Sequence, residues 1–447
     1  MISRQKCREL LIINFAIAHN NEICYNVAIM KTKKILLAVA ALSVLNVFGS
    51  GFALYEPSTV STALGGALLG KGVDASANFN NPATLTDLTN MTVTVGFVTE
   101  HPRARVKVNK ADAQYMDPGF FVLPHFQLAI PLPWDFAFGF GIAPEWGLGS
   151  QYPDSWVGNW NSKQTDVQGF VLNPNLAYKV TDKWSIGAGL RFLYFNFEQW
   201  SQPQAAANGV KYGTMKNWMK GDNGFSDFGF QVGTSYKVFD NFAVGLMYKS
   251  PIDVHVRGRT RTSVYGINVP VAATVVEKAA LANNGRAAAD LQVPQSIAFG
   301  FNWDITDTVH LGAMVSWTEW SCMDKLTFRL PGGNKPVNMD WEDTWRFSIA
   351  PSWDFAEDWT AMCSYVFDSD PTVPSQESTM LPPGNRHILT GGLAWRCWAG
   401  LELALSYGIV LMDSKSMHLT DSTGKKYTLD YHRGLSHAVG FSITYRF

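Results

Sequence analysis

The sequence predicts an all-β fold, a 14-stranded antiparallel transmembrane β-barrel whose lumen is plugged by an N-terminal hatch. Three observations predict this fold. Apolar residues alternate with small or polar ones through residues 90–447, and the connections between the alternating runs are short and long in strict turn. Residues 51–89, which precede them, show almost no strand alternation. The first two features are typical of bacterial outer-membrane barrels, and the third supplies material to fill a wide lumen.

The composition agrees with a membrane barrel and argues against other classes of protein. The 447-residue chain is 47% apolar and 13% aromatic but only 16% charged. A soluble enzyme of this length usually carries more charge and more amphipathic helix. The formal net charge of −1 offers no basic surface for a nucleic acid. We therefore expect a cell outer-membrane location, no nucleic-acid partner and no cofactor.

The front of the chain has the pattern of an export signal. A lysine cluster (Lys31, Lys33 and Lys34) precedes an apolar run over residues 35–48, which is too short to span a bilayer as a helix. Small residues follow it, so residues 30–50 are predicted to be a signal peptide, with the mature chain starting at Ser50 or Gly51. Residues 1–29 do not suit a signal, and we expect them to be a spurious extension from an upstream start codon.

Residues 51–89 are predicted to form the hatch. The segment is rich in small residues, too long for a linker and too poor in large apolar residues to fold alone. The motif Asn81-Pro82-Ala83 ends its small-residue stretch and closes the hatch. About eight strands make a barrel that its own side chains fill, so a barrel of fourteen strands needs additional material inside. We expect the hatch to occupy the lumen.

Residues 90–447 are predicted to form the barrel. The last run has one apolar face, made of Leu435, Val439, Phe441, Ile443, Tyr445 and Phe447. A soluble sandwich would also alternate, but here the apolar face is aromatic at its ends and the other face holds Arg, Glu and Gly, as in a wet lumen. A run of about 11 residues rises roughly 36 Å and, tilted by about 45°, crosses the ~25 Å apolar band.

The predicted strands and connections divide the barrel as follows. The runs are 90–101, 119–131, 134–144, 167–180, 183–199, 224–238, 241–256, 292–304, 308–320, 344–354, 358–369, 386–397, 400–412 and 435–447. The long connections, expected to be outside loops, are 102–118, 145–166, 200–223, 257–291, 321–343, 370–385 and 413–434. The six short connections are expected to be periplasmic turns, which places both termini in the periplasm.

Five stretches carry a resemblance to a known family. They are Gly51-Phe52-Ala53-Leu54, Asn81-Pro82-Ala83, Trp184-Ser185-Ile186-Gly187, Trp317-Thr318-Glu319-Trp320-Ser321, and Phe367-Asp368-Ser369-Asp370-Pro371 running on to Pro382-Pro383-Gly384-Asn385-Arg386. In this order and spacing, the chain resembles the long-chain fatty-acid transporter (FadL/TodX) family of outer-membrane proteins over residues 51–447. The resemblance implies a monomeric barrel with an N-terminal hatch that passes hydrophobic molecules across the outer membrane.

The resemblance also implies roles for single residues. It places Phe52 at a ligand pocket inside the barrel and assigns Asn81 to holding the hatch. Two departures concern the ligand's head group: Asn196 stands where the well-studied fatty-acid binders carry an Arg, and Thr327 stands where they carry a Lys. Cations lie nearby, at Arg191 in the first case and at Lys325 and Arg329 in the second.

The third strand is the expected site of an opening in the wall. Pro144 ends this run after Gly139 and Gly141. A proline cannot donate to the strand ladder, and glycines in strands often mark bulges. Simple strand termination explains the pattern equally well, whereas the family resemblance favours a kink that opens the barrel sideways.

For a carboxylate ligand, strand alternation selects the candidate partners. The small-residue face of Ser185, Gly187 and Gly189 continues to Arg191, which makes Arg191 the expected inner partner and Lys325 an outer one. The alternative is that Arg191 pairs with a lumen carboxylate such as Glu402. We expect uptake of long-chain fatty acids, with uptake of an alkane or a small aromatic hydrocarbon as the alternative. Outer-membrane lipid and lipopolysaccharide are the expected surroundings.

Other functions and sites find less support. A general porin would keep an open aqueous pore, and no G-x-S-x-G, H-E-x-x-H or C-x-x-C motif indicates an enzyme or a metal site. The outer loops offer Met215, Trp218, Met219 and Met380, either as an outer apolar groove or as ordinary loop packing. Three cysteines remain in the predicted mature chain, Cys322, Cys363 and Cys397, as one disulfide plus a free thiol or as three buried thiols.

Overall fold

The structure is a computed structural model that describes residues 51–447, apart from 208–209, 267–276, 279, 377 and 422–423. The predicted upstream extension 1–29 and signal peptide 30–50 lie outside the described residues. Contacts divide the chain into Met1–Val44 and Leu45–Phe447, and every described residue belongs to the second unit. No helix among the described residues is long and apolar enough to cross a membrane.

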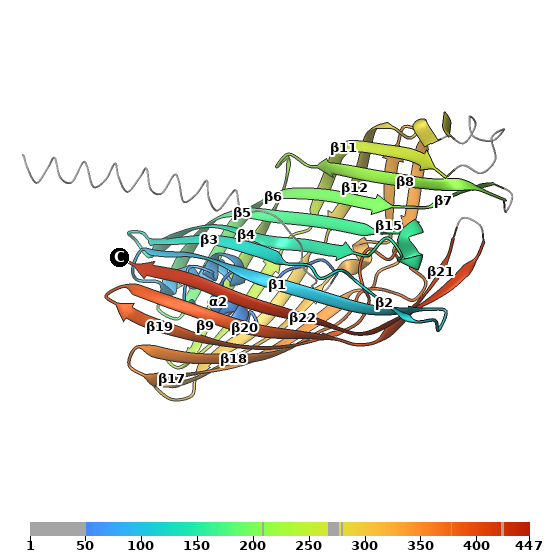
Figure 1. The fold of residues 1–447 in the computed structure, drawn as a ribbon. Helices are drawn as coiled ribbons and strands as arrows, with labels where there is room; N and C mark the ends of the chain where they lie inside the picture. The colour runs from blue at the N-terminus through green and yellow to red at the C-terminus, as the bar shows by residue number, and fades with distance from the viewer. Residues whose placement is uncertain (1–50, 208–209, 267–276, 279, 377, 422–423) are drawn as a thin grey trace, which may run out of the picture. The chain divides into compact units, whose positions relative to one another are not determined.

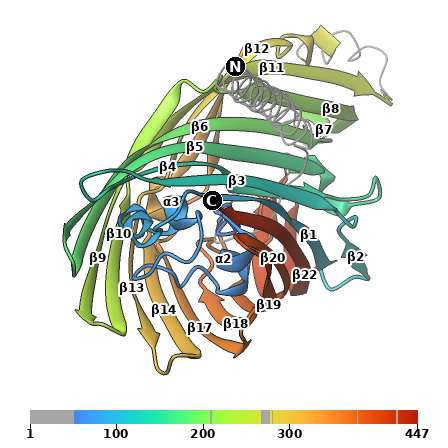
Figure 2. The same ribbon diagram turned by 90° about the vertical axis from the view of Figure 1, so that its left-hand side faces the viewer.

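Fourteen antiparallel strands form a closed ring, which confirms the predicted fold class (Figures 1 and 2). Each predicted run overlaps one of them, and β22 pairs with β1 to close the ring. In ring order they are β1 (Thr92–Val108), β3 (Phe121–Pro131), β4 (Phe136–Gln151), β5 (Gln164–Thr181), β6 (Trp184–Ser201), β9 (Asp227–Phe239), β10 (Phe242–Lys249), β13 (Ser296–Asp304), β14 (Val309–Thr318), β17 (Thr344–Ala356), β18 (Trp359–Asp368), β19 (Arg386–Trp398), β20 (Leu401–Met412) and β22 (Lys426–Arg446).

The two faces of the strands differ as the alternation predicts. In β20, Leu405 and Tyr407 are half exposed, whereas Ser406 between them is buried inside the ring. The exposed apolar residues face lipid rather than water, since closure of the sheet satisfies the backbone groups and leaves apolar side chains as the outer surface. The inner face is lined by small and polar residues, and these leave room for the hatch.

The predicted outside loops contain further strands, which corrects the division into strands and loops. They are β2 (Ala113–Tyr115), β7 (Gln204–Ala207), β8 (Val210–Asp222), β11 (Ile252–Tyr265), β12 (Gly285–Val293), β15 (Lys325–Leu330), β16 (Gly333–Asn338) and β21 (Lys415–Thr420). The run predicted over 241–256 breaks at Ser250-Pro251 into β10 and β11. These strands escaped prediction because their exposed face is polar, as suits the part of the wall beyond the bilayer.

Four of these strands and the outer end of β6 form one sheet, which we call the outer sheet. It consists of the outer end of β6 followed by β8, β11, β12 and β15, each paired with the next. It extends the barrel wall at the end opposite the C-terminus (Figure 1).

The hatch lies inside the ring, with α2 (Thr59–Ala63), α3 (Ala77–Asn80) and the 3-10 helix η1 (Pro82–Asp87) (Figure 2). Asn78 is the main link between the hatch and the wall. Its side chain donates to the carbonyls of Leu128 (3.0 Å) and Phe140 (3.3 Å). Its main-chain carbonyl accepts from the side chains of Gln231 (2.7 Å) and Asn173 (3.1 Å). One hatch residue therefore bonds to four wall strands, β3, β4, β5 and β9.

Asn81 joins the hatch to the wall at a second point. Its Nδ2 donates to the carbonyls of Leu69 (2.7 Å) and Thr234 (3.0 Å), and its Oδ1 accepts from the Ala83 amide (3.1 Å). A Cβ added at Gly233 would stand 2.0 Å from Asn81 Oδ1, so this strand position requires glycine for the hatch to approach.

Gly139 and Gly141 also face the hatch. Both lie in the part of β4 that is paired with β3 on one side and β5 on the other. A Cβ at Gly139 would stand 1.9 Å from Asn78 Oδ1, and one at Gly141 would stand 2.5 Å from the Phe79 ring. The two glycines thus provide space for α3 in an unbroken stretch of the ladder.

The three cysteines match neither sequence-based alternative. Cys322, Cys363 and Cys397 form no disulfide, and Cys363 is exposed while the other two are partly buried. Alternation on strand β18 places Cys363 on its outer face, which explains why it is not in the core. Burial raises the pKa of the Cys322 thiol to about 12, which leaves it protonated and unreactive at neutral pH.

Candidate functional site

The barrel wall has a gap between β3 and β4. Their ladder runs from Pro131↔Ala137 to Phe126↔Ile142. Among the described residues, no pair between β3 and β4 follows Ile142. Here β4 also has a bulge against β5, since Pro144 pairs with Phe170 and Trp146 with the adjacent Gly169. A bulge bends its strand and increases the local twist. The β3 edge of β4 is therefore unpaired with β3 from residue 143 onward.

The start of the hatch occupies this free edge. The Leu54 amide donates to the Glu145 carbonyl (2.8 Å), and the Gly147 amide donates to the Phe52 carbonyl (2.7 Å). Ala53 and Trp146 thus form an isolated antiparallel bridge. Leu54 packs into a small cluster with Phe121 and Leu123 on β3, so residues 52–54 bridge the two edges of the gap.

The Phe52 side chain forms the centre of an aromatic cluster in the lumen. Its ring lies 4.9 Å from Trp320, 5.8 Å from Trp146, 6.1 Å from Trp341 and 6.2 Å from Phe195, centroid to centroid. Phe52 itself is only 5% exposed. The cluster combines the hatch, two barrel strands and the loop that follows β14, and all of its members are aromatic.

A cavity of about 90 Å³ adjoins this cluster and the gap. Its lining includes Leu54, Pro144, Trp146 and Met247 together with three charged groups. Those are Glu145, Arg191 and Lys249. An apolar cavity with a few convergent polar groups is the usual form of a ligand site. In this structure the cavity is smaller than a long acyl chain, so entry of such a chain requires movement of Phe52 or the hatch.

The three charges form one buried group. Arg191 donates to Glu145 Oε2 from Nη2 (2.7 Å) and from Nε (3.2 Å), and from Nη1 to the carbonyl of Ser250 (3.0 Å). Lys249 donates to the other oxygen of Glu145. Two cations thus share one carboxylate, which leaves a formal charge of +1 beside the cavity. The Lys249 side chain is 22% exposed against 1% for Arg191, so Lys249 is the more accessible cation.

The structure separates the predicted head-group residues. Arg191 lies inside the barrel at the cavity, with Glu145 as its carboxylate partner; Glu402 pairs with Arg446 instead (3.1 Å). Asn196 is five positions along β6 and therefore on the opposite face. Lys325 and Arg329 are exposed on β15, while Leu326 and Phe328 between them join the buried core.

Sequence reasoning missed Glu145 and Lys249. Glu145 lies one residue beyond Pro144, where the sequence predicts the end of the strand, whereas β4 continues through the bulge to Gln151. Lys249 ends β10, immediately before the Ser250-Pro251 break, inside a run that was treated as one strand. A lysine and a glutamate on inward positions of different strands can be predicted to form an ion pair only when the strand order and register are known.

A second hollow lies among the outer elements. It measures about 680 Å³ and is lined by Met380, Trp160, Phe328 and Leu419 among other residues. Met380 is therefore in an outer groove, and it is buried. Trp218 lies elsewhere, in a hollow on the outer sheet, and Met219 packs against the core. Among the residues that the structure describes, no group of three or more His, Cys, Asp or Glu side chains could hold a metal ion.

Comparison with known families and proteins covers nearly the whole described chain. Residues 40–447 match the family model described as outer membrane protein transport protein (OMPP1/FadL/TodX). The long-chain fatty acid transport protein of Escherichia coli (strain K12) is 23% identical over 420 residues, 84% of this chain and 91% of that protein. Outer membrane protein P1 of Haemophilus influenzae is 23% identical over 480 residues, 93% of this chain and 100% of that protein.

Solved structures share the fold. A Pseudomonas aeruginosa FadL homologue superposes with a TM-score of 0.80 at 19% identity, covering 89% of this chain and all of that one. The P. putida toluene transporter TodX has a TM-score of 0.69 at 15% identity, covering 88% of this chain and 99% of that one.

Proposed function

Because the chain belongs to the OMPP1/FadL/TodX family of outer membrane transport proteins, we propose that it takes up long-chain fatty acids through this hatch-plugged barrel without energy coupling. The protein resides in the outer membrane, and hydrophobic molecules are its cargo. The observation that carries the fatty-acid proposal is the group of Arg191, Lys249 and Glu145, because its excess positive charge faces a cavity whose other lining residues are uncharged.

The charge of this group suits an amphiphile with one carboxylate. A buried charge without a partner is costly, so a second anion beside Lys249 would complete two ion pairs. One buried indole N–H group of the cavity lining, that of Trp146, has no acceptor among the described residues. Unsatisfied buried donors are rare in native proteins, and this one would suit a ligand that brings oxygen acceptors. A bare alkane would satisfy none of these groups.

The pathway that we propose has three parts. A fatty acid enters the outer groove around Met380, moves to the cavity at Phe52 as the hatch shifts, and leaves sideways through the gap between β3 and β4. Burial of each CH₂ contributes about 0.8 kcal/mol, so the apolar lining alone draws the chain in. We also propose that the protein is a monomer without catalytic activity, in contact with outer-membrane lipid and lipopolysaccharide.

Replacing Lys249 with methionine tests the head-group assignment. Met keeps most of the volume and apolar stem but removes the accessible cation, so we expect palmitate to bind at least tenfold more weakly. Hexadecane has no charge to lose, and its affinity should stay within about twofold. Equilibrium binding of both ligands to protein purified in a detergent unlike any lipid measures this difference.

The matched control is Lys71→Met. Lys71 belongs to the hatch and pairs with Asp304 of β13 (2.7 Å), away from the Arg191 cavity. Its replacement should change neither the palmitate nor the hexadecane affinity. If Lys249→Met lost affinity for palmitate and for hexadecane to the same extent, the assignment of a carboxylate to this site would be refuted. That result would favour a neutral hydrocarbon, the alternative suggested by the shared fold with a toluene transporter.

Replacing Pro144 with alanine tests the exit. Pro144 lies beside the Glu145 bulge, near the point where the β3–β4 ladder ends at Ile142. Alanine at this position would provide the amide donor that proline lacks. If the kink maintains the opening, a straighter β4 should slow uptake several-fold while ligand affinity at the outer groove stays unchanged. Uptake of labelled oleate by whole cells at equal protein levels gives the rate, and an unaltered rate would contradict the lateral exit.

A further inference from the structure

The outward face of the outer sheet changes character along β6. Leu190 is 45% exposed on this face, within the apolar band, and Tyr194 lies on the same face four residues further along the strand. The next outward positions are Asn196 and Glu198. Aromatic residues such as Tyr194 mark the membrane interface in these barrels. The face beyond Asn196 therefore begins at the level of the lipid headgroups of the outer leaflet.

Strand register gathers arginines and lysines on this face. Glu198 of β6 pairs with Lys220 of β8, Lys220 with Arg259 of β11, and Arg259 with Arg286 of β12. Directly paired residues point to the same side of a sheet, so these four side chains form one row. The neighbouring rows add Arg257 and Arg329 on one side, and Lys216 and Arg261 on the other.

The available carboxylates neutralise only part of this charge. Glu198 pairs with Lys220 (3.0 Å), and Asp290 pairs with both Arg257 (2.8 Å) and Arg329 (2.5 Å). Arg259 and Arg286 have no carboxylate partner in the described part of the chain. They are also direct cross-strand neighbours, an arrangement that is destabilising for like charges unless an anion lies between them.

The two unpaired arginines line a hollow of about 1000 Å³. Its rim includes Trp200 and Trp218, with Lys216 4.3 Å above the Trp200 ring and Arg261 5.7 Å from the Trp218 ring. Cation–π contacts hold these two further cations beside the hollow. The site thus presents guanidinium and ammonium groups around an open space, with flat aromatic surfaces at its edge.

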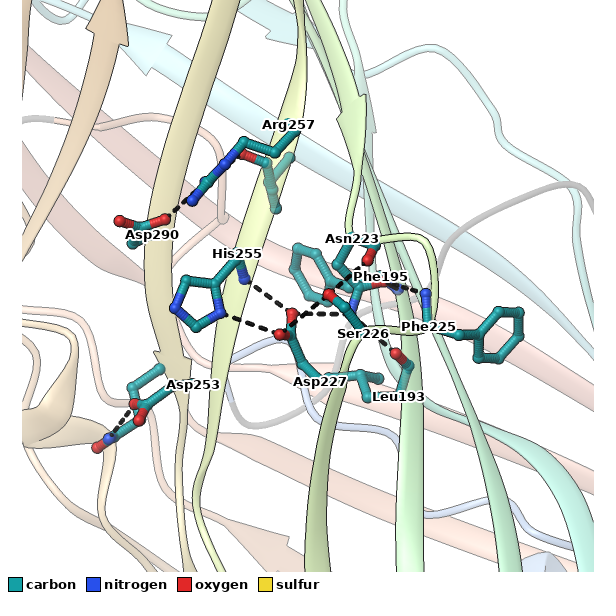
Figure 3. A network of polar contacts seen from close by, with 12 residues as sticks. Leu193, Phe195, Asn223, Phe225, Ser226, Asp227, Asp253, His255, Arg257 and Asp290 are labelled. Atoms are coloured by element: carbon teal, nitrogen blue, oxygen red, sulfur yellow. Dashed lines mark hydrogen bonds and ion pairs between the residues drawn. The ribbon is translucent and has the colours of Figure 1, made fainter.

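Polar contacts hold the base of this face in place. His255 of β11 donates its amide to Asp227 Oδ2 (2.8 Å) and contacts Asp227 Oδ1 through Nδ1 (2.9 Å). Asn223 donates to Asp227 (3.0 Å) and to the Leu193 carbonyl (2.8 Å), which joins β6, β9 and β11 where the outer sheet leaves the ring (Figure 3). Figure 3 also shows Arg257 and Asp290 just beyond this junction.

We propose that Arg259 and Arg286 form a binding site for the phosphate groups of the phosphorylated glycolipid of the outer leaflet. A guanidinium presents a fork of donors that matches phosphate oxygens, and paired arginines suit a doubly charged group. The position at headgroup level selects a lipid over a soluble anion, because acyl chains below the site can contact the apolar band. This inference deepens the proposed contact with lipopolysaccharide by assigning it residues.

Binding of purified lipid A to Arg259→Ala/Arg286→Ala tests the site. Native mass spectrometry of the detergent-purified protein would count bound lipid as bisphosphorylated or monophosphorylated lipid A is titrated. We expect wild-type protein to prefer the bisphosphorylated form and the double variant to bind it at least tenfold more weakly. Arg259→Lys/Arg286→Lys keeps both charges but lacks the donor forks, so it should bind this form several-fold more weakly. Lys425→Ala/Lys426→Ala, a charge-matched change at the β21–β22 tip, should retain all of the binding.

Several results would overturn the proposal. They are equal binding by wild-type and double-alanine protein, equal affinity for the two lipid A forms, or displacement of lipid A by millimolar inorganic phosphate, which would indicate a site for the free anion. A heat-dependent gel shift verifies that each variant is folded, and the lysine variant keeps the test informative if the alanine variant is not. Palmitate affinity, measured in parallel, should be unchanged, so failure here is distinct from failure of the proposed uptake function.

Discussion

Replacing Asn78 with alanine is expected to turn the plugged barrel into an ion-conducting one. The Asn78 side chain links the hatch to β3 and β4 through the carbonyls of Leu128 and Phe140, and to β5 by accepting from Asn175 (3.1 Å). Alanine removes these bonds, and each buried polar group left without a partner costs about 1–3 kcal/mol. Because about 1.4 kcal/mol is a factor of ten in an equilibrium constant, the population with a displaced hatch should rise at least tenfold. Conductance of single proteins in planar bilayers measures it directly.

Asn80 provides the matched control. It lies two residues away, and among the described residues its side chain bonds to Ser61 (3.0 Å) and Ser76 (3.0 Å), both within the hatch. Asn80→Ala should therefore loosen the hatch internally without releasing it from the wall, and conductance should remain near the wild-type level. Identical conductance in wild type and Asn78→Ala would show that other contacts, such as those of Asn81, are sufficient to hold the hatch.

Deleting residues 51–54 behind an intact export signal should reduce fatty-acid uptake at least tenfold while the barrel stays folded. The deletion removes Phe52 from its aromatic cluster and removes both hydrogen bonds from the hatch to the free edge of β4. The hatch then has no strand that connects the cavity with the gap. Cell uptake of labelled oleate, with surface levels matched by antibody, gives the effect.

Phe52→Ala separates the two contributions in that deletion. It removes the ring but leaves the backbone bridge between Ala53 and Trp146 in place. If the ring contributes ligand contacts, this variant alone should weaken palmitate binding, since an apolar side chain of this size contributes about 1.5–3 kcal/mol when buried. If uptake is unchanged both in the deletion of residues 51–54 and in Phe52→Ala, these residues have no role in transport.

Much of the fold could be predicted from local pattern. Side chains in a strand alternate with period two, so an apolar face against lipid and a small or polar face toward the lumen are visible along a single run such as β20. The strict alternation of short and long connections then indicated both the direction of each strand and the closed ring. The family's motifs pointed to the N-terminal hatch and to Phe52 as parts of a ligand site.

Prediction failed at two charged residues of the site. Strand β4 continues past Pro144, the predicted end of its run, to Gln151, so Glu145 was assigned to a loop and not to the wall. Lys249 has the inward parity of Ala243 and Met247, but alternation alone does not show which inward charges meet. The strands of the outer sheet were missed for a different reason. They lie beyond the bilayer, where water covers the outer face and the outward side chains need not be apolar. These strands therefore lack the alternation of apolar and polar residues by which the other strands were predicted.

The sequence by itself therefore determined the barrel, the number of its strands and the presence of a hatch, because each rests on contacts with lipid or on the chain's own period. Only the tertiary structure decided which charges meet. Arg191 pairs with Glu145 rather than Glu402, and Arg259 stands beside Arg286, because register joins residues that are 46 and 27 positions apart. Charges interact through space, and no local pattern records the distance between strands that pair only after the ring has closed.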